Sequence, residues 1–355
     1  MNSLVLLIIC VAILVAGYVC YGGWLCKQWG VGENKTETPA HTMEDGVDYV
    51  PAKAPVLMGH HFSSIAGAGP ITGPIGAAMF GWLPVTLWIL VGGIFFGGVH
   101  DFGALFASVR NKGQSIGEII SANMSKRAKQ LFIIFSYLTL ILVVAAFASI
   151  VASTFGAVYD ESGAVDMVKS TTPATVAMIS ILFILIAIVF GFCVYRRNMP
   201  MGIASVVGVL AIVVIMAIGM NFHPLYLSTK TWMWIVGLYI AIASVTPVWI
   251  LLQPRDYLSS FLLYAMLAVA AFGVIVAHPT FDSTFPAVTS FAVDNGNGIQ
   301  FMFPVLFTTV ACGAISGFHS LVSSGTTSKQ LDKETDAKPI AYGGMLLECV
   351  LAVLT

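Results

Sequence analysis

Apolar runs of about 20 residues, separated by short polar breaks, recur from one end of the chain to the other. A helix of about 20 residues is what crosses the roughly 30 Å of hydrocarbon in a bilayer. Charged residues make up 9% of the chain, against about a quarter in a soluble domain. The sequence therefore predicts an all-α, multi-pass protein of the lipid bilayer, with no separate soluble domain.

The apolar runs predict nine spans, with a tenth beginning at about Ile340. The nine are 3–26, 60–81, 82–108, 130–158, 173–194, 202–221, 232–252, 257–277 and 301–327. The residues after Ile340 are too few for a comfortable crossing, because a span needs about 20. We therefore expect the chain to be a fragment of a longer protein.

The positions of Lys and Arg predict the orientation, because these residues accumulate in cytoplasmic loops. If the first helix starts outside, all 16 basic residues except Lys169 and Lys230 fall on the inner side. Basic residues form no broad patch, so nucleic-acid binding is not expected. The six cysteines lie in or beside apolar segments without paired spacing, and we interpret them as small buried hydrophobes.

The span 60–81 contains glycine and proline where a regular helix is expected. Its Gly67-Ala-Gly-Pro70 stretch divides it into two halves, and proline is favoured at the first position of a helix. The second half therefore presents a helix N-terminus inside the membrane. A single interruption of this kind is common and can be purely structural, since neighbours often satisfy the freed groups.

A counterpart lies five spans later, in the oppositely directed span 232–252. Thr246 is a competent N-cap and Pro247 a favoured first residue, so a half-helix is expected to start there. Paired, inverted interruptions indicate an inverted-repeat secondary transporter. A single transmembrane domain, 1–355, would hold an extra helix at 3–26, a first repeat at about 60–221 and a second from about 232, incomplete at 355.

In such a transporter the substrate binds at the breaks, where a half-helix N-terminus attracts a carboxylate. The expected substrate-binding residues are Ala66, Gly67, Ala68, Gly69, Pro70, Ser244, Val245, Thr246 and Pro247.

Polar residues inside the spans are the candidates for ion coupling, because they are costly in lipid. These candidates are His60, His61, His100, Asp101, Ser316, His319, Ser320, Ser323 and Ser324. Asp101 is the strongest single candidate, with an ion pair to Arg110 or Arg255 as the structural alternative.

Each of the other polar residues has a structural role as the alternative to a functional one. The serines either permit close helix packing or supply oxygen ligands to sodium. The histidines either form hydrogen-bonded packing contacts or relay protons. Arg255 and Asp256 either form a local charge pair or an inner gate.

Four stretches together resemble the carbon starvation protein A (CstA) family. They are DYVPAKAPVLMGHHFSSIAGAGPITGP (48–74), HDFGALFASVR (100–110), PVWILLQPRDYLSSF (247–261) and CGAISGFHSLVSSGTTSKQL (312–331). The resemblance implies an inner-membrane carrier for peptides or pyruvate, linked to nutrient limitation. This family is similar to the amino acid, polyamine and organocation superfamily, which implies a leucine-transporter-like fold.

The expected function is therefore ion-coupled symport of short peptides in carbon starvation. Pyruvate or another small carboxylate is the alternative substrate. The coupling ion is H⁺ or Na⁺, with H⁺ slightly preferred, and no cofactor is expected. An enzyme is disfavoured because Ser316 and His319 share one helix without an accompanying acid, and no metalloprotease or phosphate-loop motif occurs. A channel or nutrient sensor remains an alternative, and the oligomeric state stays open.

Overall fold

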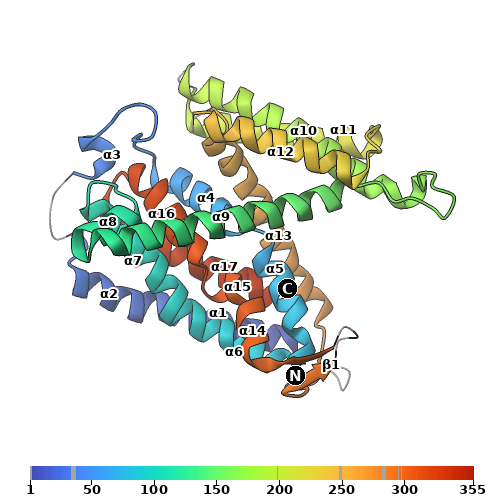
Figure 1. Cartoon of the computed structure of the whole chain (residues 1–355), viewed down its shortest axis with the longest axis horizontal. Coiled ribbons are helices and arrows are strands. Elements are labelled where there is room, and N and C mark those ends of the chain that lie inside the picture. Colours follow the sequence, from blue (N-terminus) through green and yellow to red (C-terminus); the bar gives the residue numbers. More distant parts are fainter. Residues whose placement is uncertain are drawn as a thin grey trace. The chain divides into compact units, whose positions relative to one another are not determined.

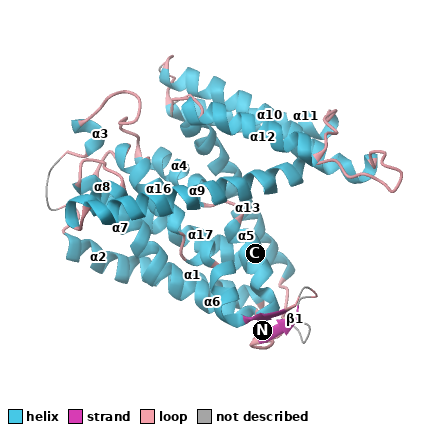
Figure 2. Cartoon of the chain, viewed as in Figure 1, coloured by secondary structure: helices cyan, strands magenta, loops and turns pink. Residues whose placement is uncertain are grey.

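The structure, a computed structural model, describes residues 2–32, 37–197, 199–247, 250–281, 285–294, 296 and 298–355. Helices make up nearly all of its regular structure, beside one small hairpin (Figure 2). Among the described residues, seven helices are long and apolar enough to cross a membrane. They are Ser3–Trp29, Trp82–Arg110, Lys126–Phe155, Met167–Val194, Met201–Asn221, Leu252–Ala277 and Glu334–Leu354. The chain is thus an all-α polytopic membrane protein, as expected.

Two compact units make up the chain, Met1–Ile119 with Ser259–Thr355, and Ile120–Leu258. Their boundaries fall within α8 and α13, and the expected repeat limits stay a prediction. The helices of the first unit, including these two, are α1 (Ser3–Ala16), α2 (Gly22–Trp29), α3 (Pro39–Thr42), α4 (Ala54–Ile65), α5 (Gly69–Ala77), α6 (Trp82–Val91), α7 (Gly98–Arg110), α8 (Ile116–Asn123), α13 (Leu252–Ala277), α14 (Met302–Thr309), α15 (Ala311–Ala314), α16 (Gly317–Gly325) and α17 (Gly343–Leu354).

Short irregular turns continue several of these helices. There are π-helical turns at Gly17–Tyr21, Gly92–Gly97 and Lys338–Tyr342, and 3₁₀ turns at Ala78–Phe80, Thr327–Lys329 and Glu334–Asp336. The hairpin pairs β1 (Ala292–Asp294) antiparallel with β2 (Ile299–Phe301), with Val293 opposite Gln300.

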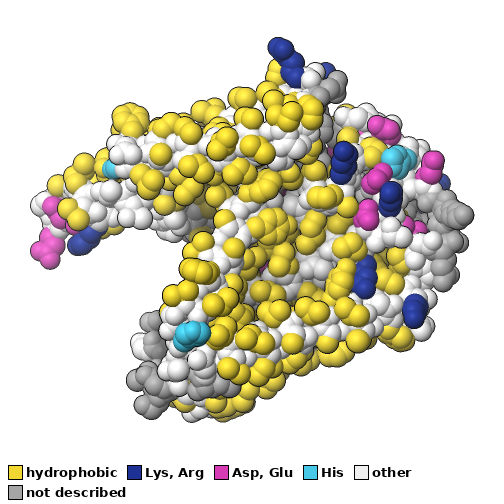
Figure 3. All heavy atoms as spheres, turned by 180° about the vertical axis from the view of Figure 1, so that it is seen from behind, with side chains coloured by type: hydrophobic (Ala, Val, Ile, Leu, Met, Phe, Trp, Pro, Cys, Tyr) yellow, Lys and Arg dark blue, Asp and Glu magenta, His cyan; other side chains and the backbone are white. Residues whose placement is uncertain are grey.

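The second unit holds α9 (Lys126–Phe155), α10 (Met167–Tyr195), α11 (Met201–Asn221) and α12 (Thr229–Val245) with the first residues of α13. Side chains that bond a backbone N–H in the first turn start three of these helices: Ser125, Asp166 and Ser228. Large apolar side chains of α9 to α12 remain exposed. Hydrophobic side chains cover much of the surface visible in Figure 3, as lipid contact requires.

The main core lies in the first unit, around α17. Buried side chains from α1, α4, α6 and α7 meet those of α17, including Met345 and Cys349, and Tyr342 of the preceding π-helical turn (Figure 1). The tenth span was expected to start at about Ile340, but its helix starts at Glu334 and runs for 21 residues. That length suffices for a crossing, so the expectation of a span too short to cross was wrong.

Candidate functional site

The first break lies where the sequence predicts it. Helix α4 ends at Ile65, α5 begins at Gly69, and Ala66 between them has non-helical angles, φ −77° and ψ 73°. Pro70 occupies the first turn of α5, where its missing N–H leaves no donor unpaired. The predicted interruption at Gly67–Pro70 is therefore confirmed.

A second break interrupts the span that was expected to be continuous at 301–327. Ile315 and Ser316 are extended, with φ values of −158° and −121°, and they separate α15 from α16. Ser316 is the N-cap residue of α16 but makes no capping hydrogen bond with its side chain.

These two interrupted helices pack against each other. A Cβ atom added to Gly69 would lie 2.5 Å from Cβ of Cys312, and one added to Gly313 would lie 3.6 Å from Cα of Pro70. Helix α4 likewise packs against α16. The N-terminus of α5 thus lies beside α15, and the N-terminus of α16 follows α15 by two residues, so two positive helix ends meet the same short segment.

The counterpart break at Thr246 is described only up to Pro247. Helix α12 ends at Val245, and the hydroxyl of Thr246 donates to the carbonyl of Ile242 at 2.8 Å. The next described helix begins at Leu252, and Val248 and Trp249, whose N–H groups a cap at Thr246 would bind, lie outside the described residues. The expected half-helix start at Thr246–Pro247 therefore stays a prediction. A residue before proline is disfavoured in a helix, which explains the end of α12 at Val245.

Ser244, Val245, Thr246 and Pro247 belong to the second unit, and the first break to the other. A substrate site shared by these two breaks stays a prediction. The first unit offers its own pair of breaks instead, at 66–68 and 315–316.

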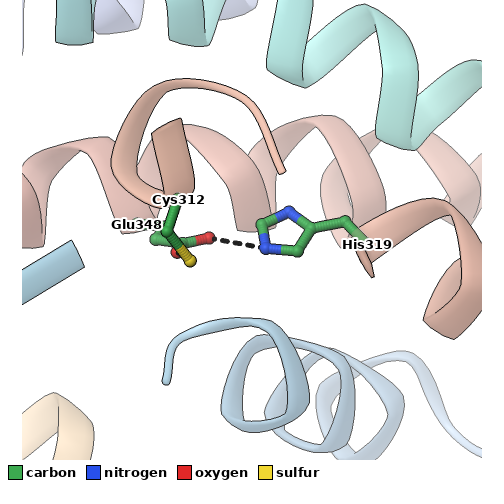
Figure 4. A group of neighbouring side chains, drawn as sticks. All are labelled: Cys312, His319 and Glu348. Carbon is green, nitrogen blue, oxygen red and sulfur yellow. Dashed lines mark hydrogen bonds and ion pairs between the residues drawn. The ribbon is translucent and has the colours of Figure 1, made fainter. Parts of the chain in front are cut away.

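A buried acid–histidine cluster lies next to this second break. Asp101 on α7, His319 on α16 and Glu348 on α17 all have fully buried side chains. Nδ1 of His319 lies 2.8 Å from Oδ2 of Asp101, and its Nε2 lies 3.4 Å from Oε2 of Glu348. Figure 4 shows the imidazole and the Glu348 carboxylate facing each other, with Cys312 beside them. His319 therefore lies between two carboxylates.

Close packing of glycines brings α7 to the second break. Gly92 and Gly97, in the π-helical turn before α7, both face Ala314, and a Cβ added to Gly92 would lie 2.7 Å from Cβ of Ala314. Asp101 follows within the first turn of α7. Such π-helical turns are frequent at functional sites, where they redirect side chains.

The charges of the cluster do not cancel with a single proton on His319. Two carboxylates face this histidine, and Asp101 also lies beside His100, whose Nδ1 is 3.1 Å from Oδ1. The side chain of His100 is 34% exposed. An uncompensated charge is costly in a buried site, so the cluster favours uptake of a further cation.

The alternative partners of Asp101 are engaged elsewhere. Arg110 pairs with Glu334 at 2.7 Å, and Arg255 pairs with Asp256 at 2.7 Å. The local charge pair expected for Arg255 and Asp256 is therefore present. An ion pair between Asp101 and either arginine is absent from the described structure.

The remaining candidates for ion coupling differ in whether their side chains make hydrogen bonds within the described structure. His61 is buried and its Nδ1 lies 2.9 Å from Oγ1 of Thr327, which fits the packing role, and His60 is buried beside it. The hydroxyls of Ser320 and Ser324 donate to carbonyls of their own helix. Ser323 is buried with no hydrogen-bond partner among the described residues.

Sequence reasoning missed Glu348 and the role of Cys312. Glu348 is the one acidic residue after Lys338, within an apolar run. An ionisable residue in a span is a functional candidate by default, so this signal was present. Glu348 was overlooked because the apolar run that contains it was interpreted as an incomplete span.

Known proteins match this chain over nearly its whole length. The family described as carbon starvation protein CstA matches residues 2–355. The peptide transporter CstA of Campylobacter jejuni is 37% identical and that of Bacillus subtilis 38% identical, over 99% and 100% of this chain and 49% and 57% of theirs. The pyruvate/proton symporter BtsT of Escherichia coli is 36% identical, over 99% of this chain and 48% of its own.

The chain spans about half the length of the curated relatives it matches. These relatives are named as transporters and a symporter, not as enzymes. Together with the membrane-length helices, they identify a multi-pass protein of the inner membrane. No solved structure matches the chain.

Proposed function

We propose that this chain, which belongs to the carbon starvation protein CstA family, forms part of a proton-coupled carrier that takes up short peptides. Pyruvate or another small carboxylate is the alternative substrate. The names of the relatives support both, since several are peptide transporters and one is a pyruvate/proton symporter. Both substrate classes carry a carboxylate, which is the group that the site must recognise.

The observation that carries this proposal is the packing of two interrupted helices beside the buried cluster. Helices α5 and α16 both begin inside the first unit, next to α15. Helix N-termini carry partial positive charge and bind carboxylates. We therefore assign the substrate carboxylate to the breaks at Ala66–Ala68 and Ile315–Ser316, which replaces Ser244–Pro247 as the partner of the first break.

The coupling ion would enter at Asp101, His319 and Glu348. Protonation of this cluster would remove its excess negative charge beside the substrate. A proton is favoured because one relative is named a proton symporter. Sodium is the alternative, and the hydroxyls of Ser320 and Ser324, which donate to carbonyls of their own helix, keep their oxygen lone pairs for such an ion.

Uptake into proteoliposomes tests the proposal. The full-length protein is reconstituted, and uptake of labelled di- and tripeptides and of pyruvate is followed under a proton gradient alone and a sodium gradient alone. Peptide uptake driven by the proton gradient is the expected result. Uptake of pyruvate alone would establish the alternative substrate, and uptake driven only by sodium would refute proton coupling. If neither substrate enters under either gradient, a sensor or channel replaces the carrier.

A further inference from the structure

Three different ligand atoms converge beside the second break. Sγ of Cys312, Nε2 of His319 and a carboxylate oxygen of Glu348 all lie within 4.8 Å of one another (Figure 4). Glu348 presents Oε1 to the sulfur at 3.7 Å and Oε2 to the imidazole at 3.4 Å. The three side chains come from α15, α16 and α17, so the fold assembles them from separate helices.

Two of these atoms have no hydrogen-bond partner. Nε2 of His319 and Oε2 of Glu348 are fully buried and make no hydrogen bond in the described part of the chain. Leaving such atoms unsatisfied is costly, and more so when they are charged. A cation between them would satisfy both.

Asp101 orients the imidazole for such a cation. Its Oδ2 lies 2.8 Å from Nδ1 of His319, so the carboxylate accepts a hydrogen bond from Nδ1–H. In the neutral imidazole this leaves the lone pair on Nε2, which faces Glu348 and Cys312. A carboxylate behind a histidine is the usual support of a metal-binding imidazole.

We propose that Cys312, His319 and Glu348 bind a divalent transition-metal ion, with zinc as the best match. Nitrogen, thiolate sulfur and carboxylate oxygen form a donor set typical of zinc. Tetrahedral zinc places neighbouring ligand atoms about 3.5 Å apart, and the three ligand atoms here lie within 4.8 Å of one another. Three protein ligands leave a fourth position for water. Cys312 is then a ligand, in contrast to the sequence interpretation of it as a buried hydrophobe.

This site does not depend on the proposed substrate or on the coupling ion. A metal ion and a coupling proton would compete for the same atoms, but metal binding is measured without transport. Failure of metal binding therefore leaves the carrier proposal intact, and failure of uptake leaves the metal site intact.

Cobalt titration of the purified full-length protein tests the site. The protein in detergent is stripped with a chelator, and Co²⁺ is added while thiolate-to-cobalt charge transfer is followed by absorption. We expect one Co²⁺ per chain with a thiolate band, and displacement of Co²⁺ by Zn²⁺. Wild-type protein that binds no stoichiometric cobalt, or binds it without the thiolate band, overturns the proposal without any variant.

Variants then identify the ligands. Cys312→Ser should abolish the thiolate band, and His319→Gln and Glu348→Gln should each weaken affinity by more than about tenfold. Asp101→Asn should weaken it by about 10–100-fold, as loss of an outer partner does. The matched control is Cys349→Ala, a fully buried cysteine next to Glu348 whose sulfur lies against Gly93. A band that survives Cys312→Ser, or is lost in Cys349→Ala, contradicts the assignment.

Discussion

Nδ1 of His319 lies 2.8 Å from Oδ2 of Asp101, although 218 positions separate the two residues in the sequence. Both side chains are fully buried, on α16 and α7. This contact joins the second break to a carboxylate inside a membrane-length helix. A charge-assisted hydrogen bond of this kind fixes the orientation of the imidazole. We therefore expect substitution of its acceptor, Asp101, to have the largest effect on coupling.

Asp101→Asn should abolish gradient-driven uptake while leaving the fold intact. Asparagine keeps an acceptor for Nδ1 of His319 but removes the negative charge that attracts the coupling proton. We expect proton-driven uptake in proteoliposomes to fall by more than about tenfold, the scale of a lost charged hydrogen bond. The control is Glu161→Gln, which neutralises an exposed loop carboxylate in the second unit. Unchanged uptake in Asp101→Asn would remove this residue from coupling.

Glu348→Gln should raise the thermal stability of the protein and uncouple substrate uptake from the proton gradient. The substitution removes one negative charge from a cluster whose charge is not balanced by His319 alone. Because burial of an unpaired charge is costly, we expect a gain of about 1–3 kcal/mol in unfolding free energy in metal-free protein. Thermal unfolding in detergent with chelator measures this gain, and a lower midpoint than the wild type would contradict the charge argument. Uptake should no longer respond to the proton gradient.

Gly69→Ala should destabilise the protein, because the close packing of the two breaks leaves no room for a methyl group. The added Cβ would lie 2.5 Å from Cβ of Cys312, an atom that cannot rotate away. Overpacking of this kind costs about 1–3 kcal/mol. The matched control on the same helix is Gly76→Ala, whose added Cβ would meet Cγ2 of Thr309 at 3.4 Å. Equal thermal midpoints for the two variants would show that the breaks are not packed as described.

The sequence predicted the first break because its cause is local. Pro70 sets the start of α5, and the glycines around it weaken any continuous helix. The second break has a tertiary cause. No proline occurs in 312–325, but Ala314 lies against Gly92 and Gly97, and the chain opens at Ile315–Ser316 beside this contact.

The candidate site was predictable only in part, because its assembly depends on tertiary contacts. Asp101 and His319 are ionisable residues in apolar segments, which the sequence displays. Their contact with each other and with Glu348 depends on which helix faces meet, and that is not a property of any one segment. At Thr246–Pro247 the residues that favour the start of a helix equally favour the end of one, and α12 ends directly before them.

Thr327→Val distinguishes the two roles considered for His61. The substitution removes the hydroxyl that lies 2.9 Å from Nδ1 of this fully buried histidine, so one ring nitrogen loses its partner. We expect a loss of about 1–3 kcal/mol in unfolding free energy, since an unsatisfied polar atom is left buried. Thr86→Val is the matched control, because the hydroxyl of Thr86 bonds only the carbonyl of Trp82 in its own helix and its loss should cost little. If His61 is a packing residue, the Thr327→Val protein that remains folded should keep proton-driven uptake. Loss of the proton dependence with stability unchanged would instead assign His61 to proton relay.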